Sequence, residues 1–593
     1  MAFLKRSRRS KNGCVYESWS IVESVRTAKG PRQRTIATLG KAPEYEAEER
    51  LGWEDVVDQL SGRGPGRRGG LFESSAEPPA WAHVDLRKVR VERLRRLGDV
   101  LLALTLWKRL RLGLFFEAAL TAGREQIPWS MVACLHTVAR FCEPSSDWAI
   151  ADSFFPKTAL GDLLGLAPDK IYENRLYRGL DAVLPCRRAL FSHLKTVYGE
   201  LFGACFDILL YDVTSTYFEG QAEGNAKAAR GYSRDSRPDC QQVCIGLVVT
   251  SEQLPLAFEV LAGNQTDVTT VEDIFEVMEA TYGRARRIWV LDRGMVSEEN
   301  LEELRRRGAS YLVGTPRSML RRCERELLTG SWEQVQPGVE IKEVFLPSEG
   351  SVRERYMLCR SADRVEKDRA IMARAASRLD VGLTALQTQI RSGRERSRER
   401  AERRVGRLLE RYSRAGRLFK IQIAEADGRL TMKLRRNTAV EDWVALQNGC
   451  YLLRTNVTEL SPAELWRTYI GLTEAEAAFR QLKGPLGLRP VYHHKDSRTE
   501  AHIFIAFLAL CLRRSLALWM KARGLGTAPQ KLLEELRQVH SLDVVLTAKQ
   551  DIEIRLRVVG VPEESTRVLL HRLGLRLPNR PKIIENVVAT LPS

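Results

Sequence analysis

The chain has 593 residues, more than a single hydrophobic core accommodates, so we expect about three to four domains. A composition of 44% hydrophobic and 28% charged residues excludes a chain that is disordered throughout. The 93 Lys and Arg against 75 Asp and Glu give a net charge of +18, which favours a polyanionic partner, with nucleic acid ahead of a membrane surface. Basic chains without nucleic-acid function also exist, so charge alone decides nothing further.

The 11 cysteines form no CxxC pair, and the closest two, Cys240 and Cys244, have no histidine at a ligand-like spacing. We therefore expect reduced, mostly buried thiols rather than structural zinc. The basic N-terminus lacks the apolar run of a signal peptide, and the longest apolar run, 503–512, is about half of what a bilayer-spanning helix needs. These features predict a soluble, cytoplasmic protein with no membrane partner.

The first 204 residues divide into three parts. Alternating β-formers at 14–40, around a Lys-Gly-Pro turn signal, predict a hairpin within an N-terminal region of residues 1–60. A Gly-, Pro- and Arg-rich stretch predicts a flexible linker over 61–90. Apolar residues three and four apart then predict a helical domain over 91–204, a candidate DNA-binding domain without an evident helix-turn-helix motif.

From residue 205 to 320 the pattern becomes strand-rich. Short β-branched runs predict five strands, with a helix at 297–308 between the last two. These runs lie at 206–218, 241–250, 254–263, 286–292 and 311–316. Strands first, then a strand–helix–strand unit, predict a mixed sheet with flanking helices.

A charge-dense interval follows, with residues 362–418 predicted as helical. Between 391 and 420 there are 12 Lys and Arg against 4 Glu. This composition is typical either of a solvated or coiled-coil helix or of a helix that lies along phosphates, and the pattern leaves both open. The turn signal Asp427-Gly428 predicts a hairpin, and 449–456 predicts a returning strand.

Two aspartates follow apolar strand patterns. Asp212 comes after ILLY and Asp292 after IWVL. Carboxylates are costly to bury unless they are paired or bound to metal, so each aspartate is a candidate site residue. The alternative for each one alone is a cap for the element that follows.

A third acid lies in a predicted helix. Glu476 and Lys483 are seven residues apart, which is about two turns, so both side chains lie on one helix face. The alternative is a capping box from Thr473 to Glu476, in which Glu476 merely caps the helix. Converging carboxylates repel one another without a cation, and Mg²⁺ or Mn²⁺ would remove that repulsion. Two such ions can activate a nucleophile and stabilise the leaving oxygen at phosphorus.

The residues around the third acid fit the pattern Y-x2-R-x3-E-x6-K at three of its four positions. The four residues are Tyr469, Leu472, Glu476 and Lys483. YDVTSTYFEG around Asp212 and VLDRGM around Asp292 precede them in order. On these motifs, residues 205–515 resemble bacterial insertion-sequence transposases of the DDE, RNase-H-like class, and most of all the group with this Tyr–Arg–Glu–Lys signature. In this chain, Leu472 occupies the arginine position of the signature. Any role of the signature arginine in positioning the DNA strand is therefore in doubt here.

The resemblance implies an α/β fold with an RNase-H-like, mixed five-stranded sheet and flanking helices. The core would comprise 205–320 and 457–520, interrupted by a β-rich and helical insertion at 321–456. A helical N-terminal domain would precede the core, and a helical tail over 521–593 would follow it.

The resemblance also implies a catalytic site. Asp212, Asp292 and Glu476 would bind two Mg²⁺ or Mn²⁺ ions. The residues expected to contact DNA are Tyr469, Arg480 and Lys483 on the third-acid segment and Arg230, Arg234 and Arg237 in a basic loop.

Other acids compete for this role. Asp235 and Asp239 lie among the loop arginines, which favours salt-bridged positions in a DNA-facing loop. Asp267 is expected to cap a turn, Glu219 stays a further candidate, and His493-His494 is expected to end a loop rather than to touch phosphate.

The expected function is a transposase that cuts double-stranded DNA at terminal inverted repeats and joins it to target DNA, as a homodimer in a synaptic complex. The alternatives are an RNase-H-like nuclease without strand transfer and an inactive, transposase-derived DNA-binding protein.

Overall fold

The computed structural model describes residues 2–11, 14–27, 30–40, 83–121, 123–282, 287–329, 331–346, 354–426, 429–548, 552–578 and 582–588. The chain divides into two compact units, Met1–Val84 and Asp85–Ser593. Most of the linker predicted over 61–90 lies outside the described residues.

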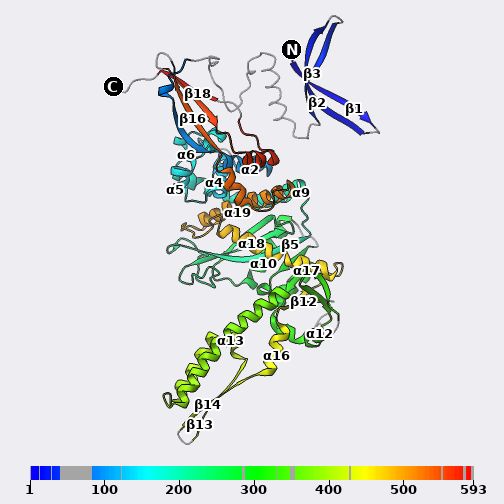
Figure 1. Cartoon of the computed structure of the whole chain (residues 1–593), viewed down its shortest axis with the longest axis vertical. Coiled ribbons are helices and arrows are strands. Elements are labelled where there is room, and N and C mark those ends of the chain that lie inside the picture. The colour runs from blue at the N-terminus through cyan, green and yellow to red at the C-terminus, as the bar shows by residue number, and fades with distance from the viewer. Residues whose placement is uncertain are drawn as a thin grey trace, which may run out of the picture. The chain divides into compact units, whose positions relative to one another are not determined.

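The first unit contains an antiparallel sheet with the strand order β1-β2-β3 (Figure 1). Its strands are β1 (Ala2–Lys11), β2 (Cys14–Thr27) and β3 (Gly30–Gly40). The pairing of Thr27 with Gly30 confirms the predicted hairpin. The sequence did not predict β1, because its run of Arg, Lys and Ser carries no apolar alternation.

A layer of helices opens the second unit. Its helices are α2 (Gly98–Arg109), α3 (Leu112–Ala119), α4 (Trp129–Cys142), α5 (Asp147–Ala149), α6 (Phe155–Lys157), α7 (Leu160–Leu164), α8 (Glu173–Val183) and α9 (Arg187–Phe202). They share one hydrophobic core with the strands that follow, so the helical region over 91–204 is not a separate domain.

The long helix α19 (Asp496–Ala522) holds this layer against the sheet. It packs on α4 and α8 on one side and on β7 on the other. It is the one described helix long and apolar enough to cross a membrane, and 89% of its most apolar window is buried inside the protein. Phe504 and Phe507 on α19 lie in the core as expected, as does Trp289 in β8.

The central sheet has nine strands rather than the five predicted, in the order β10-β11-β12-β15-β9-β8-β5-β6-β7. All five predicted strands are present: β5 (Ile208–Tyr217), β6 (Gln242–Thr250), β7 (Pro255–Ala262), β8 (Ile288–Leu291) and β9 (Ser310–Gly314). Strands β5 to β7 form an antiparallel meander, whereas β8 runs parallel to β5 and β9 parallel to β8. This mixed sheet is RNase-H-like in strand order and direction.

The four further strands come from the insertion. They are β10 (Glu333–Gln336), β11 (Val339–Val344), β12 (Arg355–Ser361) and β15 (Cys450–Thr455). Strand β15 pairs antiparallel with β9 and so covers what would be a free sheet edge. The five-strand prediction was wrong because sequence alone does not reveal which distant strand completes an edge.

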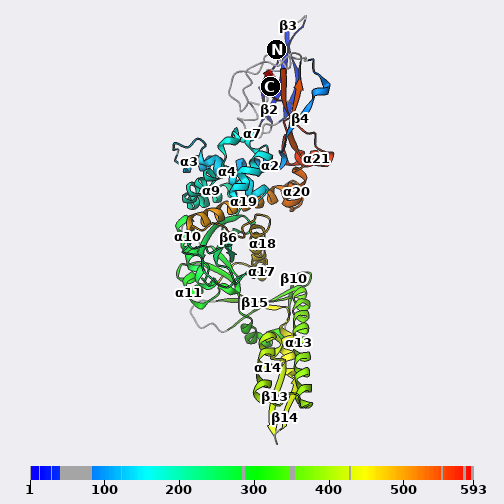
Figure 2. The same cartoon turned by 90° about the vertical axis from the view of Figure 1, so that its left-hand side faces the viewer.

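Around the sheet lie α10 (Thr270–Tyr282), α11 (Glu298–Arg306), α12 (Glu324–Leu328), α16 (Thr438–Gln447), α17 (Pro462–Ile470) and α18 (Leu472–Lys483). The remainder of the insertion builds a core of its own from α13 (Ala362–Arg391), α14 (Arg398–Arg411), α15 (Ser413–Gly416), β13 (Phe419–Ala426) and β14 (Arg429–Arg436). The predicted hairpin is therefore confirmed, and β14 runs alongside α13 (Figures 1 and 2).

The prediction of a helical tail over 521–593 was wrong. That segment contains α20 (Pro529–Leu536) and α21 (Glu564–Leu573), but also β16 (His540–Thr547), β17 (Ile552–Val559) and β18 (Lys582–Val588). These strands form a sheet in the order β18-β17-β16-β4 with β4 (Arg90–Arg96), from the other end of the unit. The many charged residues of these strands hide their alternation from a sequence pattern.

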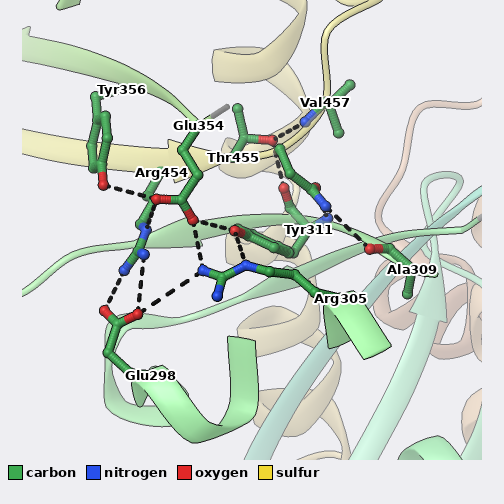
Figure 3. Close-up of polar contacts among 10 residues, drawn as sticks. Glu298, Arg305, Ala309, Tyr311, Glu354, Tyr356, Arg454, Thr455 and Val457 are labelled. Carbon is green, nitrogen blue, oxygen red and sulfur yellow. Dashed lines mark hydrogen bonds and ion pairs between the residues drawn. The ribbon is translucent and has the colours of Figure 1, made fainter. Parts of the chain in front are cut away.

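A buried ionic network fastens the insertion strands to the core (Figure 3). The carboxylate of Glu354, just before β12, is 4% exposed. It accepts hydrogen bonds from Arg454 at 2.8 Å and from Arg305 at 2.8 Å. The hydroxyls of Tyr311 and Tyr356 donate to it as well. The network therefore joins β9, β12, β15 and α11 at one point.

Charge pairing keeps Glu354 ionised. Burial raises the pKa of Glu354, but hydrogen bonds from Tyr311 and Arg454, together with the charges of the arginines, outweigh burial and lower the pKa overall. Arg454 also donates to Glu298 at 2.5 and 3.1 Å, so its own charge is neutralised on two sides.

Removing the Glu354 carboxylate takes away a buried partner shared by the guanidinium groups of Arg454, which is 10% exposed, and of the half-buried Arg305. We expect Glu354→Ala to lower the free energy of unfolding by about 3–5 kcal/mol, measured by urea denaturation of the full chain. Glu340→Ala is the matched control, because its ion pair with Arg360 joins β11 and β12 of the same sheet but is substantially exposed. It should cost less than about 1 kcal/mol, and equal losses would show that the network does not fasten the sheet.

Candidate active site

Asp212 and Asp292 come together because β5 and β8 are parallel and in register. Tyr211 lies opposite Leu291, so the next residue of each strand is an aspartate at the same edge of the sheet. Asp212 is half-buried within β5, and its Oδ1 accepts the backbone N–H of Val213 at 2.8 Å. Asp292 directly follows β8 and is exposed. The structure thus places both predicted aspartates in one site.

Glu476 lies on α18, which packs against β5. The helix begins at Leu472, with Gly471 as its cap and no side-chain capping bond. The capping-box alternative for Glu476 is therefore wrong, because Thr473 lies inside the helix and its hydroxyl donates to the carbonyl of Ile470. Glu476 is exposed and faces the same cavity as Asp292.

The three carboxylates interact through their charges. Burial raises the pKa of Asp212, the backbone N–H of Val213 lowers it, and the negative charges of Asp292 and Glu476 raise it further, to about 7. Without a cation, the central carboxylate therefore resists ionisation near neutral pH.

A cavity of about 380 Å³ lies beside these acids. The core contributes Asp292, Glu476 and Tyr469 to its wall, and the insertion contributes Arg364, Lys367 and Tyr451. The cavity thus combines carboxylates with cationic side chains, among them Arg293 beside Asp292, an arrangement suited to phosphate and divalent metal.

Tyr469 contacts an acid rather than open solvent. Its hydroxyl is 3.5 Å from Asp292 Oδ1, and its ring stacks on Tyr451 with centroids 6.4 Å apart. The guanidinium of Arg364 lies over the Tyr451 ring at 4.4 Å. Gly314 on β9 leaves room for the Tyr469 hydroxyl, because any side chain there would collide with it. Tyr469 is therefore placed to orient Asp292, and a DNA contact by it stays a prediction.

Lys483 has a different partner from the one expected. Its ammonium lies 2.7 Å from Asp235 Oδ1 and its side chain is only 10% exposed. The side chain of Asp235 is 2% exposed and also pairs with Arg489. Burial lowers the pKa of Lys483, and Asp235 opposes that shift. The geometry ties the basic loop to α18, and direct DNA contact by Lys483 stays a prediction.

The basic loop is held by ion pairs. Arg237 pairs with Asp239 at 2.9 Å and with Glu219 at 3.3 Å, as expected of a salt-bridged loop. Arg234 pairs with Asp267, which begins a short 3-10 helix. Two further predicted DNA contacts are exposed, namely Arg230 and Arg480.

Two histidines expected to end a loop do so. His493 and His494 follow Val491, whose backbone pairs with Tyr217 and Glu219. His493 is turned inward, with Nε2 3.8 Å from Asp147.

The cysteines show no metal-binding arrangement among the residues that the structure describes. The ten cysteines whose side chains the structure describes are free of disulfide bonds, and all of these but Cys205 and Cys240 are buried.

The donor chemistry of the three acids fits Mg²⁺ or Mn²⁺, since both prefer carboxylate oxygens. Among the described residues, no three His, Cys, Asp or Glu side chains already stand close enough together to hold a metal ion. Asp292 and Glu476 line the cavity whereas the half-buried Asp212 does not, so the three side chains would have to draw closer together to share an ion.

Sequence patterns missed the cavity residues of the insertion. Arg364 and Lys367 lie in the first two turns of α13, where a long charged helix gives no signal for two particular residues. Tyr451 is the second residue of β15, the strand that pairs with β9, and only the sheet order brings it beside Tyr469. Arg293, next to Asp292 in the motif, also lines the cavity and could have been named from sequence.

Comparison with known proteins identifies the family of the chain. A family model described as "Transposase DDE domain" matches residues 203–512, more than half of the chain. The chain therefore belongs to the DDE transposases, which are polynucleotidyl transferases. A second model, "IS1634 family transposase, N-terminal domain", matches residues 4–65. The protein is thus a DDE transposase of the IS1634 family.

No curated protein matches the chain. A solved structure of the piggyBac transposase synaptic complex with hairpin DNA is similar at 10% identity and a TM-score of 0.32, covering 76% of this chain and 82% of that one. A TM-score of this size does not establish a shared fold.

The raised pKa of Asp212 should affect how the stability of the metal-free protein depends on pH. A carboxyl whose folded pKa exceeds its unfolded value stabilises the fold below the unfolded pKa, and that contribution is lost as pH rises through the folded pKa. Stability of the metal-free protein should therefore fall between about pH 4 and pH 7 through this group. Thermal melting in chelator should show the fall, and Asp212→Asn should remove part of it.

Two controls separate this effect from general pH dependence. Asp292→Asn should weaken it, because one repelling charge is lost, whereas Mg²⁺ should suppress it in the wild type. If melting curves of the wild type and Asp212→Asn have the same pH dependence, Asp212 does not titrate in this range.

Proposed function

We propose that this transposase hydrolyses the phosphodiester bond at the ends of an insertion sequence and joins the resulting 3′-OH to target DNA. The convergence of Asp212, Asp292 and Glu476 beside a cavity with cationic walls carries the proposal. In the cell, the substrate would be double-stranded DNA, recognised at terminal inverted repeats, and the enzyme would work in the cytoplasm.

The three acids would hold two Mg²⁺ or Mn²⁺ ions, which supply an activated oxygen nucleophile and stabilise the leaving oxygen. Asp212 would bridge the site from its half-buried position in β5. Tyr469 would orient Asp292 through its hydroxyl, and the Lys483–Asp235 ion pair would hold α18 and Glu476 in place.

Leu472 occupies the arginine position of the Tyr–Arg–Glu–Lys signature, to whose group we assign the chain. The leucine is 7% exposed and packs in the main core, so a cation at this position would be buried away from DNA. Arg364 and Lys367 line the cavity instead. We propose that they supply the positive charge that binds phosphate beside the acids.

Two ends must be brought together before they are joined to a target. A homodimer in a synaptic complex is the arrangement we propose for this step.

Each acid can be tested separately. Asp212→Asn, Asp292→Asn and Glu476→Gln should each lower Mg²⁺-dependent nicking and joining by roughly a thousandfold or more, since the charge that binds metal is lost. DNA affinity measured in chelator should persist. Glu474→Gln is the matched control, because Glu474 lies on the same helix and faces Arg514 at 3.8 Å.

The products distinguish the competing functions. Joined products exclude a simple nuclease, and nicking without joining under every metal condition would favour it. Unchanged nicking in the Asp212 and Asp292 variants would show that the site assignment is wrong. Absence of any cleavage by the wild type would favour an inactive DNA-binding protein.

The cationic wall makes a separate prediction. Arg364→Ala should weaken cleavage roughly tenfold to a hundredfold, the equivalent of one charge-assisted hydrogen bond of about 1.5–3 kcal/mol, seen mainly as a higher KM for end DNA. Arg374→Ala is the control, since Arg374 is exposed further along α13 and bonds only to its own helix at Ala370. If Arg364→Ala and Arg374→Ala weaken cleavage equally, the loss reflects the net charge of the protein rather than the position of Arg364 in the cavity.

A further inference from the structure

The hairpin β13–β14 has one apolar face and one polar face. Ile421, Ile423 and Met432 turn inward to the separate core that the hairpin shares with α13 and α14. The alternating residues turn outward and are exposed, and they are Lys420, Gln422, Ala424, Arg429, Thr431, Lys433 and Arg435. Four of these seven are basic and none is acidic.

Two of the outward cations face each other across the hairpin. Lys420 lies opposite Arg435, and Lys433 lies opposite Gln422. Like charges directly opposite on one face of a sheet destabilise it. A hairpin that keeps such a pair on its solvent face is suited to a partner that neutralises the charge.

These cations also differ from their neighbours. On α14, Arg398 pairs with Glu402 and Arg403 with Glu399. Among the residues that the structure describes, no ion pair engages Lys420, Arg429, Lys433 or Arg435. Four arginines of α14 are thus paired with nearby glutamates, namely Arg398, Arg400, Arg403 and Arg404, whereas the hairpin leaves its charge available.

We propose that the outward face of the β13–β14 hairpin binds duplex DNA. A two-stranded β-ribbon fits the major groove, and spaced cations on it can reach the phosphates on either side. The uncharged Gln422 and Thr431 lie between the cations, in reach of base edges. This inference rests on the proposed function, because it names a further contact surface for the DNA on which the enzyme acts.

The hairpin lies far from the catalytic cavity along α13. Arg364 lines the cavity near the start of α13, and Gln387 of the same helix donates to the carbonyl of Met432 in β14 at 2.9 Å. Gln387 lies 23 positions after Arg364, a separation of about 35 Å along the helix, close to one turn of B-form DNA. The ribbon would thus contact duplex about one turn away from the cleaved phosphate.

The test compares two triple variants of the full-length protein. Arg429→Gln, Lys433→Gln and Arg435→Gln remove three outward cations from β14. Arg398→Gln, Arg400→Gln and Arg403→Gln remove three ion-paired cations from α14 of the same insertion. Affinity for a duplex of about 40 base pairs, long enough to include the one turn between the cavity and the ribbon, is measured in chelator by fluorescence anisotropy over a range of salt concentrations.

The ribbon variant should bind roughly tenfold or more weakly, and its slope of log affinity against log salt should fall by about 2.7, or 0.9 for each phosphate contact. The α14 variant should change neither quantity appreciably. Equal behaviour of the two variants, or wild-type affinity in the ribbon variant, overturns the inference. Matching melting temperatures confirm that both variants fold.

Cleavage assays separate this inference from the proposed function. At saturating protein, the ribbon variant should still nick end DNA with Mg²⁺, whereas Asp292→Asn should not. If the wild type joins DNA and the ribbon variant binds like the wild type, only the ribbon inference fails. If the wild type never cleaves but the ribbon variant alone loses affinity, the proposed function fails and the ribbon inference stands.

Discussion

The parallel pairing of β5 with β8 is the constraint on which the site depends. Tyr211 opposite Leu291 forces Asp212 and Asp292 to the same edge of the sheet, where their charges repel. The packing of α18 on β5 then brings Glu476 to them. Three acids held this way raise the free energy of the metal-free site, and a divalent cation is the partner that relieves it. The repulsion among the three acids therefore lowers the stability of the metal-free fold, and a bound cation would remove this cost.

The insertion is built into the central sheet and the cavity wall rather than being appended to them. Its strands extend the sheet through β15, the Glu354 network fastens the join, and Tyr451 and Arg364 complete the cavity wall. Because Tyr451 stacks on Tyr469, which contacts Asp292, the geometry of one acid depends on a strand that begins 158 residues later in the chain. The distal hairpin, with its own core, is free to serve another contact.

Sequence patterns predicted the features that depend on residues close together in the chain. Short β-branched runs predicted all five core strands, strand-end position indicated Asp212 and Asp292, and the spacing from Tyr469 to Lys483 selected Glu476. The remainder depends on contacts between distant residues. No spacing rule predicts that β4 pairs with β16, that Lys483 is buried against Asp235 or that Arg364 lines the cavity. The helical tail failed for the same reason, since its strands are stabilised by an edge more than 400 residues earlier.

The join between β9 and β15 has a consequence for synthesis of the protein. Tyr311 donates to Asn456, 145 residues further along the chain. At translation rates of about 5–20 residues per second, β9 waits about 7 to 30 s for its neighbour. During that interval the nascent catalytic sheet exposes an open edge, the kind of surface that pairs with other chains. Slow or interrupted translation of the insertion would therefore favour aggregation of the unfinished enzyme.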